Sequence, residues 1–482
     1  LAEQVALSRE ATQAEHARAL RQWEAVFVPT KASNSYQPAV KHDTPRWGQN
    51  APFNNLAPEV DGKKAVAGCV PLAMSMLARF FRYPAAGSGD VPGYSYQSEA
   101  GNNCTVEGIK LGEPYEWDKM KMDYSEGYTE EEAAAVAHLV YECGVMVQAK
   151  FDASTSSNTF TMGRQAIAYL GYDAAATGLY RAYYSDEAWL ELLKAELQDH
   201  PVLYSAHREE GGHSFLLDGY DEAGNLSINW GWSGQSNGYF ALSAFVPHPE
   251  RQYVLKHAAI FGLKPDQGGV SKEYLYLLSG TASNGTVFKG LEASGEIVPR
   301  RNFTMNVGGI CNGGNNPFSG YFILALTDAE GAIKDFVCGS QYFDEISPRY
   351  WRGYSNISCI LNTYPAEGDR IRGFYRSEKW GDNQWEPFLY DMTDGTVGEI
   401  PVYDNQTLAE ATTLAFGKTL KVVTVTTKDH VSWNLCDAAG KEENDLVNYD
   451  GIQLTIDASG LQGSHTLSLR RGDDTLSLTL TF

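Results

Sequence analysis

The chain has 482 residues, a formal net charge of −22 and 43% hydrophobic residues. A chain of this length is too long for one hydrophobic core, so we expect about three domains. No apolar stretch approaches the roughly 20 residues of a membrane span, and Lys and Arg do not cluster as binding to phosphates requires. The sequence therefore argues against a membrane-spanning segment and against a nucleic-acid partner.

The first predicted element is an amphipathic helix over residues 7–27, followed by a loop to Val40. We expect residues 1–37 to be an N-terminal helix and linker that precede the next domain. The chain begins at Leu1 without a methionine or a signal-peptide pattern, which fits a processed or truncated protein. The apolar face of the helix consists of Leu7, Ala11, Ala17, Leu20, Trp23 and Phe27.

A cysteine stands at the start of the next predicted helix, in the stretch Gly68-Cys69-Val70-Pro71-Leu72-Ala73-Met74. Apolar residues recur every three to four positions as far as Phe81, and Pro71 suits a first helical turn. Cys69 therefore lies at or next to the N-cap, where unpaired backbone N–H groups and the helix dipole stabilise a thiolate. The alternative is a buried structural thiol, which is the commoner fate of a lone cysteine.

His213 is the one histidine whose surroundings suit a catalytic base. Two glycines, Gly211 and Gly212, precede it and let another chain approach the backbone closely. The apolar run that follows indicates a buried strand, and the turn residues 221–225 predict a hairpin.

The returning strand of this hairpin is predicted over residues 226–232. Side chains alternate along a strand, so either Trp230 and Trp232 or Asn229 can flank the imidazole. The sequence leaves this choice open. An aromatic hairpin with a purely structural role is the alternative for the whole segment.

Gln49 lies twenty residues before Cys69. A side-chain amide at this position, together with the Cys69 backbone N–H, could donate to a developing oxyanion. Combined with the His213 strand, these residues form the layout of nucleophile, base and orienter that Cys–His acyl transfer requires.

Five segments, taken in order, make the chain resemble the streptopain family of cysteine peptidases, which have a papain-like fold. The resemblance covers residues 38–263 and implies an α+β papain-like domain at residues 38–265. It implies no metal and no organic cofactor. The segments are Trp47-Gly48-Gln49-Asn50-Ala51-Pro52-Phe53-Asn54, Gly68-Cys69-Val70 continuing to Arg82-Tyr83-Pro84, Tyr115-Glu116-Trp117-Asp118-Lys119-Met120, Tyr141-Glu142-Cys143-Gly144-Val145, and Gly212-His213-Ser214-Phe215 through Gly234.

The resemblance also assigns roles to the candidate residues. It implies that Cys69 is the nucleophile, that His213 is the general base and acid, and that Gln49 is the oxyanion donor. The expected mechanism is attack of the thiolate on a peptide carbonyl, followed by hydrolysis of the acyl-enzyme.

Four further residues complete the expected site. Trp230 matches the tryptophan that stands where papain-like enzymes usually have their orienting asparagine, and Trp232 matches a second tryptophan that lines the site. Gly212 is expected to border the substrate. Asn229 is the weaker candidate for the orienting group.

The resemblance implies protein or peptide substrates with a bulky apolar side chain two positions before the scissile bond. The chain departs from the family pattern at residues 151–158, where relatives carry a Ser-Gly-Ala-like stretch, so this preference stays open. The resemblance also implies that the protein is bacterial, secreted or on the cell surface, associated with virulence and made as a zymogen. The helix over residues 7–27 resembles the end of a propeptide that blocks the cleft, and a docking helix is the alternative.

Beyond residue 265 the pattern changes to alternating strands separated by Gly-, Asn- and Asp-rich turns. We expect two all-β domains of the immunoglobulin-like sandwich type, at residues 266–405 and 406–482. Such modules could bind a surface ligand or serve as spacers, because a fold alone does not establish a function. The predicted strands include residues 274–278, 321–326 and 371–375 in the first domain, and 420–426, 452–456, 467–469 and 476–480 in the second.

Seven cysteines cannot all pair, so at least one stays free, and Cys69 is the candidate. Two other functions remain open. A Cys–His amide acyltransferase would use the same nucleophile and base, and a surface adhesin would carry an inactive catalytic domain. The other cysteines, expected as buried thiols or disulfide partners, are Cys104, Cys143, Cys311, Cys338, Cys359 and Cys436.

Overall fold

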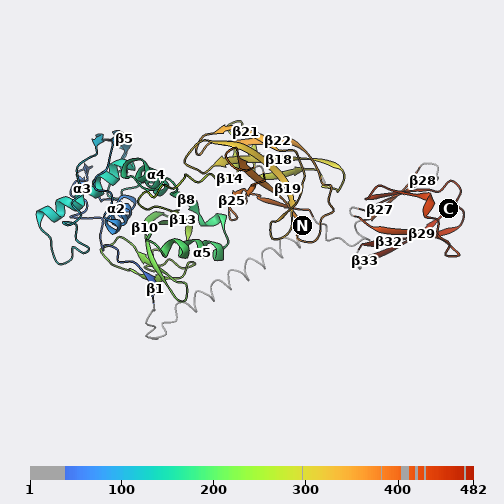
Figure 1. Cartoon of the computed structure of the whole chain (residues 1–482), viewed down its shortest axis with the longest axis horizontal. Helices are drawn as coiled ribbons and strands as arrows, with labels where there is room; N and C mark the ends of the chain where they lie inside the picture. Colours follow the sequence, from blue (N-terminus) through green and yellow to red (C-terminus); the bar gives the residue numbers. More distant parts are fainter. Residues whose placement is uncertain are drawn as a thin grey trace.

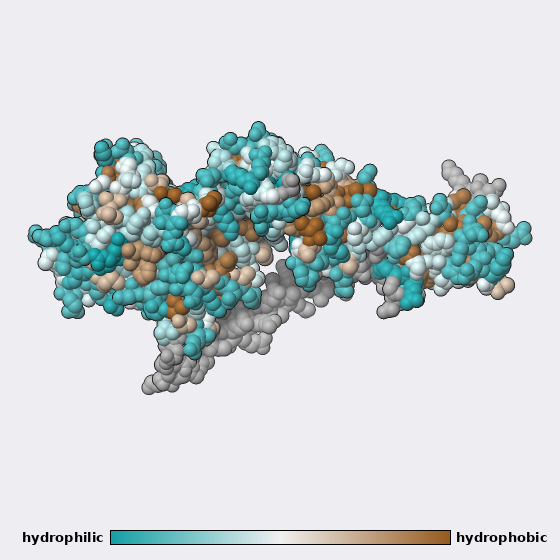
Figure 2. All heavy atoms as spheres, viewed as in Figure 1, coloured by the Kyte–Doolittle hydropathy of each residue, from teal (hydrophilic) through white to brown (hydrophobic). Residues whose placement is uncertain are grey.

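The computed structural model describes residues 38–295, 297–381, 383–402, 412–417, 422–427, 430–471 and 474–482. The helix expected over residues 7–27 lies outside them. Three parts follow one another along the molecule: a mixed α+β part, a middle β part and a small C-terminal β part (Figure 1). Hydrophilic side chains cover most of the face seen in Figure 2, as the net charge of −22 implies.

A seven-stranded antiparallel sheet organises the first part, in the order β12-β11-β10-β9-β13-β8, with β1 on the edge of β10. The expected hairpin is present, since β10 pairs with β11. The returning strand is shorter than predicted because Gly231 adopts φ +71° and turns the chain after Asn229. Residues 38–40, predicted as a loop, instead begin an edge strand. The strands are β1 Pro38–Lys41, β8 Thr177–Tyr180, β9 Val202–Arg208, β10 Gly211–Asp221, β11 Leu226–Asn229, β12 Gly238–Phe240 and β13 Leu255–Phe261.

The two faces of this sheet pack against different helices. Leu203 and Leu216 join the core formed with helix α2, whereas Tyr204 and Phe215 join a core that contains Trp189 of helix α5. This alternation follows from the two-residue period of a strand. The helices are α2 Cys69–Phe81, α3 Glu130–Met146, α4 Thr159–Leu170 and α5 Asp186–Leu197, with the 3-10 turn η1 Arg181–Tyr183.

Side-chain caps fix where three of these helices begin. Thr129 and Glu132 form a reciprocal capping box at the start of α3. Asn158 accepts a hydrogen bond from the Thr161 N–H at the start of α4, and Ser185 caps α5 in the same way. Short hairpins decorate this part: β2 Glu59–Val60 with β3 Lys63–Lys64, β4 Asp90–Val91 with β7 Ile109–Lys110, and β5 Tyr94–Gln97 with β6 Asn103–Val106.

The middle part consists of two larger sheets and a separate two-stranded one, and the strands predicted near residues 275, 323 and 373 are β14, β19 and β23. The first sheet has the order β17-β18-β14-β25 with β22 on β18, and the second has β20-β19-β23-β24 with β21 on β19 and β26 on β23. The strands of the first sheet are β14 Leu275–Leu277, β17 Leu291–Ser294, β18 Asn302–Asn312, β22 Trp351–Ile360 and β25 Leu389–Tyr390. The strands of the second sheet are β19 Phe318–Thr327, β20 Ile333–Phe336, β21 Gln341–Ile346, β23 Arg370–Ser377, β24 Glu386–Pro387 and β26 Glu399–Pro401. A separate hairpin pairs β15 Gly280–Thr281 with β16 Val287–Phe288.

The C-terminal part is a smaller pair of sheets around its own apolar core. One sheet has the order β27-β28-β31-β30 and the other β29-β32-β33. The strand predicted over residues 420–426 begins at Val422 among the described residues. The strands are β27 Thr412–Phe416, β28 Val422–Thr427, β29 Ser432–Asp437, β30 Val447–Tyr449, β31 Gln453–Asp457, β32 Ser464–Arg471 and β33 Asp474–Thr481, with the 3-10 turn η2 Asn444–Leu446.

The first and middle parts are joined by one continuous apolar cluster rather than by a bare linker. Trp189 and Phe215 of the first part belong to the same cluster as Leu275 and Phe322 of the middle part. The Tyr274 hydroxyl donates to the Gly178 carbonyl at 2.8 Å. The middle part therefore packs directly against the part that carries Cys69 and His213.

None of the helices in the described part of the chain has the length and apolar character of a membrane span.

Candidate active site

Cys69 is the first residue of α2, with Gly68 as its N-cap. Gly68 adopts φ +92°, and an added Cβ would lie 2.7 Å from the Thr155 methyl group, so both the backbone conformation and the close packing require glycine. All seven cysteines lie in the described part of the chain and are free, and Cys69 is half-buried. The helix start predicted at Cys69 is therefore confirmed.

Ser214 is the polar partner of the thiol. Hydrogen bonds from the Ser214 backbone and hydroxyl favour the thiolate, but burial outweighs them and raises the pKa of Cys69. The Ser214 hydroxyl is itself 2.8 Å from that of Thr159. Desolvation thus opposes the stabilisation of a Cys69 thiolate that the helix start leads us to expect.

His213 is 6% exposed and lies on β10, with its Nε2 atom 2.8 Å from the Trp230 carbonyl oxygen. A carbonyl oxygen can only accept, so Nε2 carries the proton of the neutral ring and Nδ1 keeps its lone pair. Burial lowers the pKa of His213 to about 4, and the positive charge of Arg251 acts in the same direction. The imidazole is therefore neutral near pH 7.

Tryptophans flank the imidazole of His213. The Trp232 ring stacks on it at 4.9 Å between centroids and an interplanar angle of 27°, and the Trp230 ring lies at 6.2 Å. The Tyr253 ring lies 5.5 Å from that of His213, measured between centroids. Burial raises the pKa of Tyr253, and the nearby Cys69 thiol contributes in the same direction. Tyr253, which the sequence did not indicate, therefore lies near both Cys69 and His213.

Asn229 points elsewhere. Its Nδ2 atom donates to the Thr44 hydroxyl at 2.9 Å and to the Pro45 carbonyl at 2.8 Å, and its Oδ1 atom accepts from the Gly231 N–H. The side chain is 1% exposed, so these bonds satisfy a buried amide. Of the two alternatives that strand alternation left open, the tryptophans are the ones beside His213.

Gln49 lies in a loop that is tied to both ends of the site. Its carbonyl accepts from the Ala67 N–H at 2.9 Å, two residues before Cys69. The Ser233 N–H donates to the Trp47 carbonyl at 2.8 Å, just after Trp232. Gly48 permits this contact because a Cβ there would clash with the Ser233 hydroxyl. The backbone of Gln49 is therefore held between the Cys69 helix and the tryptophan loop.

Cys69, His213 and Gly212 line one cavity of about 670 Å³. His207 on the adjacent strand β9 is the register partner of Gly212, and an added Cβ on Gly212 would lie 2.8 Å from the His207 ring. Sequence reasoning missed His207 and Lys256, because only the strand register places them at this cavity. Further lining residues are Gln97, Ser98, Glu99, Lys150, Ser205, Glu210, Ser214 and Ala258.

The segment 151–158, where the chain departs from the family pattern, forms one wall of this cavity. The Asp152 carboxylate accepts from the Glu99 N–H at 2.8 Å, and the Thr155 hydroxyl donates to the Val66 carbonyl at 2.7 Å. The wall is consequently fixed to the β5–β6 hairpin on one side and to the approach to Cys69 on the other.

A helix that begins at a cysteine and a strand that carries a histidine at the same cavity bring together a nucleophile and a base, as Cys–His acyl transfer requires. Residues 47–240 match the Peptidase C10 family. The resemblance predicted from the five segments is confirmed by this match.

Curated relatives agree with the family. The chain is 32% identical over 205 residues to the thiol protease/hemagglutinin PrtT of Porphyromonas gingivalis, covering 42% of this chain and 23% of that protein. It is 27% identical over 218 residues to streptopain of Streptococcus pyogenes, covering 42% of this chain and 54% of that protein. The chain thus spans about half or less of the length of these relatives.

A solved structure is also similar. The active wild-type interpain A cysteine protease of Prevotella intermedia is 28% identical, with 49% of this chain and 100% of that chain covered and a TM-score of 0.44.

Proposed function

We propose that the protein is a cysteine endopeptidase in which Cys69 forms an acyl-enzyme with a peptide carbonyl and His213 transfers the protons. The observation that carries the proposal is the shared cavity, which receives Cys69 from the start of α2 and His213 from β10. The family match over residues 47–240 supports the same chemistry.

The reaction starts from a neutral pair, because burial raises the pKa of Cys69 and lowers that of His213. As Sγ attacks the carbonyl carbon, Nδ1 of His213 takes the thiol proton, and the Trp230 carbonyl stabilises the resulting imidazolium through Nε2. The imidazolium then protonates the leaving amine. Water, activated by the neutral imidazole, hydrolyses the thioester and regenerates the thiol.

The oxyanion would lie at the N-terminus of α2, where the Cys69 N–H is one donor and the Gln49 side-chain amide the second. Gly212 offers backbone to the substrate, and Trp232 shields the imidazole from water. We assign Asn229 a positioning role in the loop before Gln49, since its amide bonds to Thr44, Pro45 and Gly231. This assignment replaces the weaker alternative in which Asn229 orients the imidazole.

The substrates in this proposal are proteins or peptides that reach the cavity in extended form. We also propose a preference for a bulky apolar residue two positions before the scissile bond. The polar wall at residues 151–158 would modify this preference. A secreted or cell-surface bacterial location, a propeptide or propeptide-like inhibitor, and a surface ligand for the β parts also stay proposals. We propose the papain-like domain at residues 38–265 and immunoglobulin-like domains at 266–405 and 406–482.

The test compares the full chain with Cys69→Ala and His213→Ala on denatured casein under reducing conditions. Both variants should lose cleavage while their circular dichroism spectra stay unchanged. Cys104→Ala, which removes another partly exposed free thiol, is the matched control and should cleave normally. Substantial residual turnover in Cys69→Ala or His213→Ala would overturn the proposal.

A further inference from the structure

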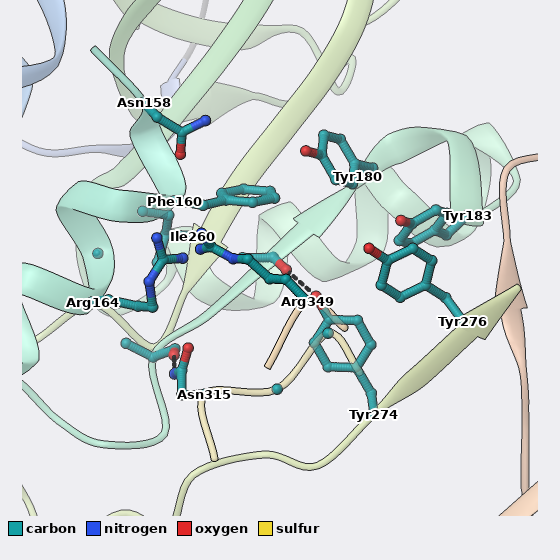
Figure 3. Close-up of a pocket in the computed structure, with 15 residues that line it drawn as sticks. Asn158, Phe160, Arg164, Tyr180, Tyr183, Ile260, Tyr274, Tyr276, Asn315 and Arg349 are labelled. Carbon is teal, nitrogen blue, oxygen red and sulfur yellow. Dashed lines mark hydrogen bonds between the residues drawn. The ribbon is translucent and has the colours of Figure 1, made fainter. Parts of the chain in front are cut away.

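A second cavity, of about 270 Å³, lies where the first part meets the middle β part. Figure 3 shows its walls: one face of α4 lies on one side, a loop of the middle part lies below, and the remaining wall carries the tyrosines Tyr180, Tyr183, Tyr274 and Tyr276. Phe160, Gly163 and Arg164 line it from α4 because positions three and four apart share a helix face. Arg349 lines it from the middle part.

Two arginines dominate this cavity. Arg164 uses one guanidinium nitrogen to donate to the Thr161 hydroxyl at 2.8 Å. Arg349 enters from a backbone with φ +67°, anchored by its N–H on the Asn312 carbonyl at 2.8 Å. The two guanidinium groups point toward one another (Figure 3), and Arg164 is half-buried whereas Arg349 is exposed.

No carboxylate balances these charges among the described residues that line the cavity. The salt bridges found in the described part of the chain likewise involve neither Arg164 nor Arg349. Partial burial lowers the pKa of Arg349, which reflects the cost of holding its charge there. In a chain with a net charge of −22, two facing cations without an acidic partner indicate a site for an anion.

The walls of the cavity are fixed by hydrogen bonds that do not involve the arginines. The Asn315 amide donates to the Ala176 carbonyl at 3.0 Å, and the Tyr274 hydroxyl donates to the Gly178 carbonyl at 2.8 Å. Both bonds link the middle part to the first part. The space between the guanidinium groups is therefore built by the packing of the two parts.

This cavity adjoins the one that contains Cys69 and His213. Asn158, Phe160 and Tyr180 line both. A polypeptide bound at the first cavity can therefore extend a side chain past Phe160 and Tyr180 toward the arginines.

We infer that the cavity between α4 and the middle β part is an accessory subsite in which Arg164 and Arg349 bind a carboxylate of the polypeptide substrate. The inference rests on the proposed peptidase function and adds to it a preference for an acidic residue at one position away from the scissile bond. Bidentate guanidinium–carboxylate bonds supply the recognition. The middle part then contributes a specificity residue to the catalytic part.

The test uses the full chain and a series of fluorogenic peptides, built on one casein segment, that carry Glu or Gln at each flanking position in turn. At one position kcat/KM for Glu should exceed that for Gln by about 10-fold or more, as hydrogen bonds to charged groups imply. Arg164→Gln and Arg349→Gln should remove this preference and leave the rates on Gln peptides unchanged. Arg349→Lys should retain only part of it.

Arg352→Gln is the matched control, because it removes one exposed arginine from the same β part outside the cavity. It should keep the full Glu preference. The absence of a Glu preference at every position, or a preference that survives both cavity variants, would overturn the inference.

Binding of the same peptides to the Cys69→Ala chain, measured by fluorescence anisotropy, separates the inference from the proposed function. Tighter binding of a Glu peptide that depends on Arg349, without any cleavage by the wild type, would support the subsite and refute the peptidase. Cleavage by the wild type, with equal binding of Glu and Gln peptides, would support the peptidase and refute the subsite. Arg349-dependent thermal stabilisation by glutarate or inorganic phosphate, with no Glu preference in any peptide, would assign the site to a free anion and overturn the inference.

Discussion

The Nε2 atom of His213 is held at 2.8 Å by the main-chain carbonyl of Trp230. The group that sets the tautomer of the imidazole is thus part of the backbone, and no substitution of a side chain deletes it directly. The indole of Trp230 has a separate role: it is fully buried and packs at 4.6 Å from Phe215.

The first prediction follows from this separation. Trp230→Phe should retain kcat within about 10-fold, because the carbonyl remains and an aromatic ring still fills the site. The buried Trp230 Nε1 atom has no hydrogen-bond partner among the described residues, so replacing the indole with a phenyl ring loses no hydrogen bond to them. Trp230→Ala should lower the free energy of unfolding by about 3–5 kcal/mol through the cavity it leaves. Urea denaturation and steady-state kinetics check both, and a loss of kcat in Trp230→Phe as large as in His213→Ala would contradict the backbone role.

Gln49 provides the second prediction. Gln49→Ala should reduce kcat by about 10²–10³-fold, as the loss of an oxyanion donor does elsewhere. Asn50→Ala, a change at the exposed neighbouring residue, should leave kcat unchanged. A neutral Gln49→Ala variant would remove this residue from the site.

The third prediction concerns pH. The pKa of His213 is about 4 in the folded protein and about 6.5 in the unfolded chain, so the unfolded state binds the extra proton in between. The stabilisation by neutral His213 is complete above about pH 6.5 and is lost as pH falls toward 4, to the extent of about 3 kcal/mol.

His257, whose pKa burial lowers to about 3, titrates in an overlapping range, so the comparison must isolate His213. We therefore compare the unfolding free energy of the wild type with that of His213→Gln, measured by urea denaturation between pH 7 and pH 4. His257 is present in both proteins, so its titration affects both. The wild type should lose more stability than the variant over this range. Parallel pH profiles for the two proteins would show that His213 is not held neutral by burial.

Gly68 provides the fourth prediction. Gly68→Ala should lower the free energy of unfolding by more than the roughly 1–2 kcal/mol of a left-handed alanine, since its Cβ also meets Thr155. Gly62→Ala is the matched control: Gly62 has φ +75° but open space around its Cβ. We expect the rate at which an epoxide-type thiol inhibitor labels Cys69 to fall in Gly68→Ala and to stay unchanged in Gly62→Ala. Equal destabilisation of the two variants would mean that the Thr155 contact carries no energy.

Local sequence patterns were sufficient to predict several parts of the site. The apolar spacing after Cys69 and the position of Pro71 predicted the start of α2, and the run after His213 predicted β10. These features depend on residues close in sequence. The family resemblance supplied Gln49, whose neighbours alone carry no such signal.

Other features depend on packing between distant segments. The raised pKa of Cys69 results from burial by the assembled fold, and His207 reaches the cavity only through its register with Gly212. The early end of β11 results from the turn at Gly231. The union of the first and middle parts depends on contacts such as Tyr274 with Gly178, which no periodicity indicates.

The most direct test of the central claim is to treat the protein with an epoxide-type thiol inhibitor, assay denatured casein cleavage under reducing conditions, and map the modified residue by mass spectrometry. The account predicts cleavage that the inhibitor abolishes, with the label on Cys69. Cleavage that continues when Cys69 is fully labelled, or a protein that shows neither cleavage nor label, would contradict it.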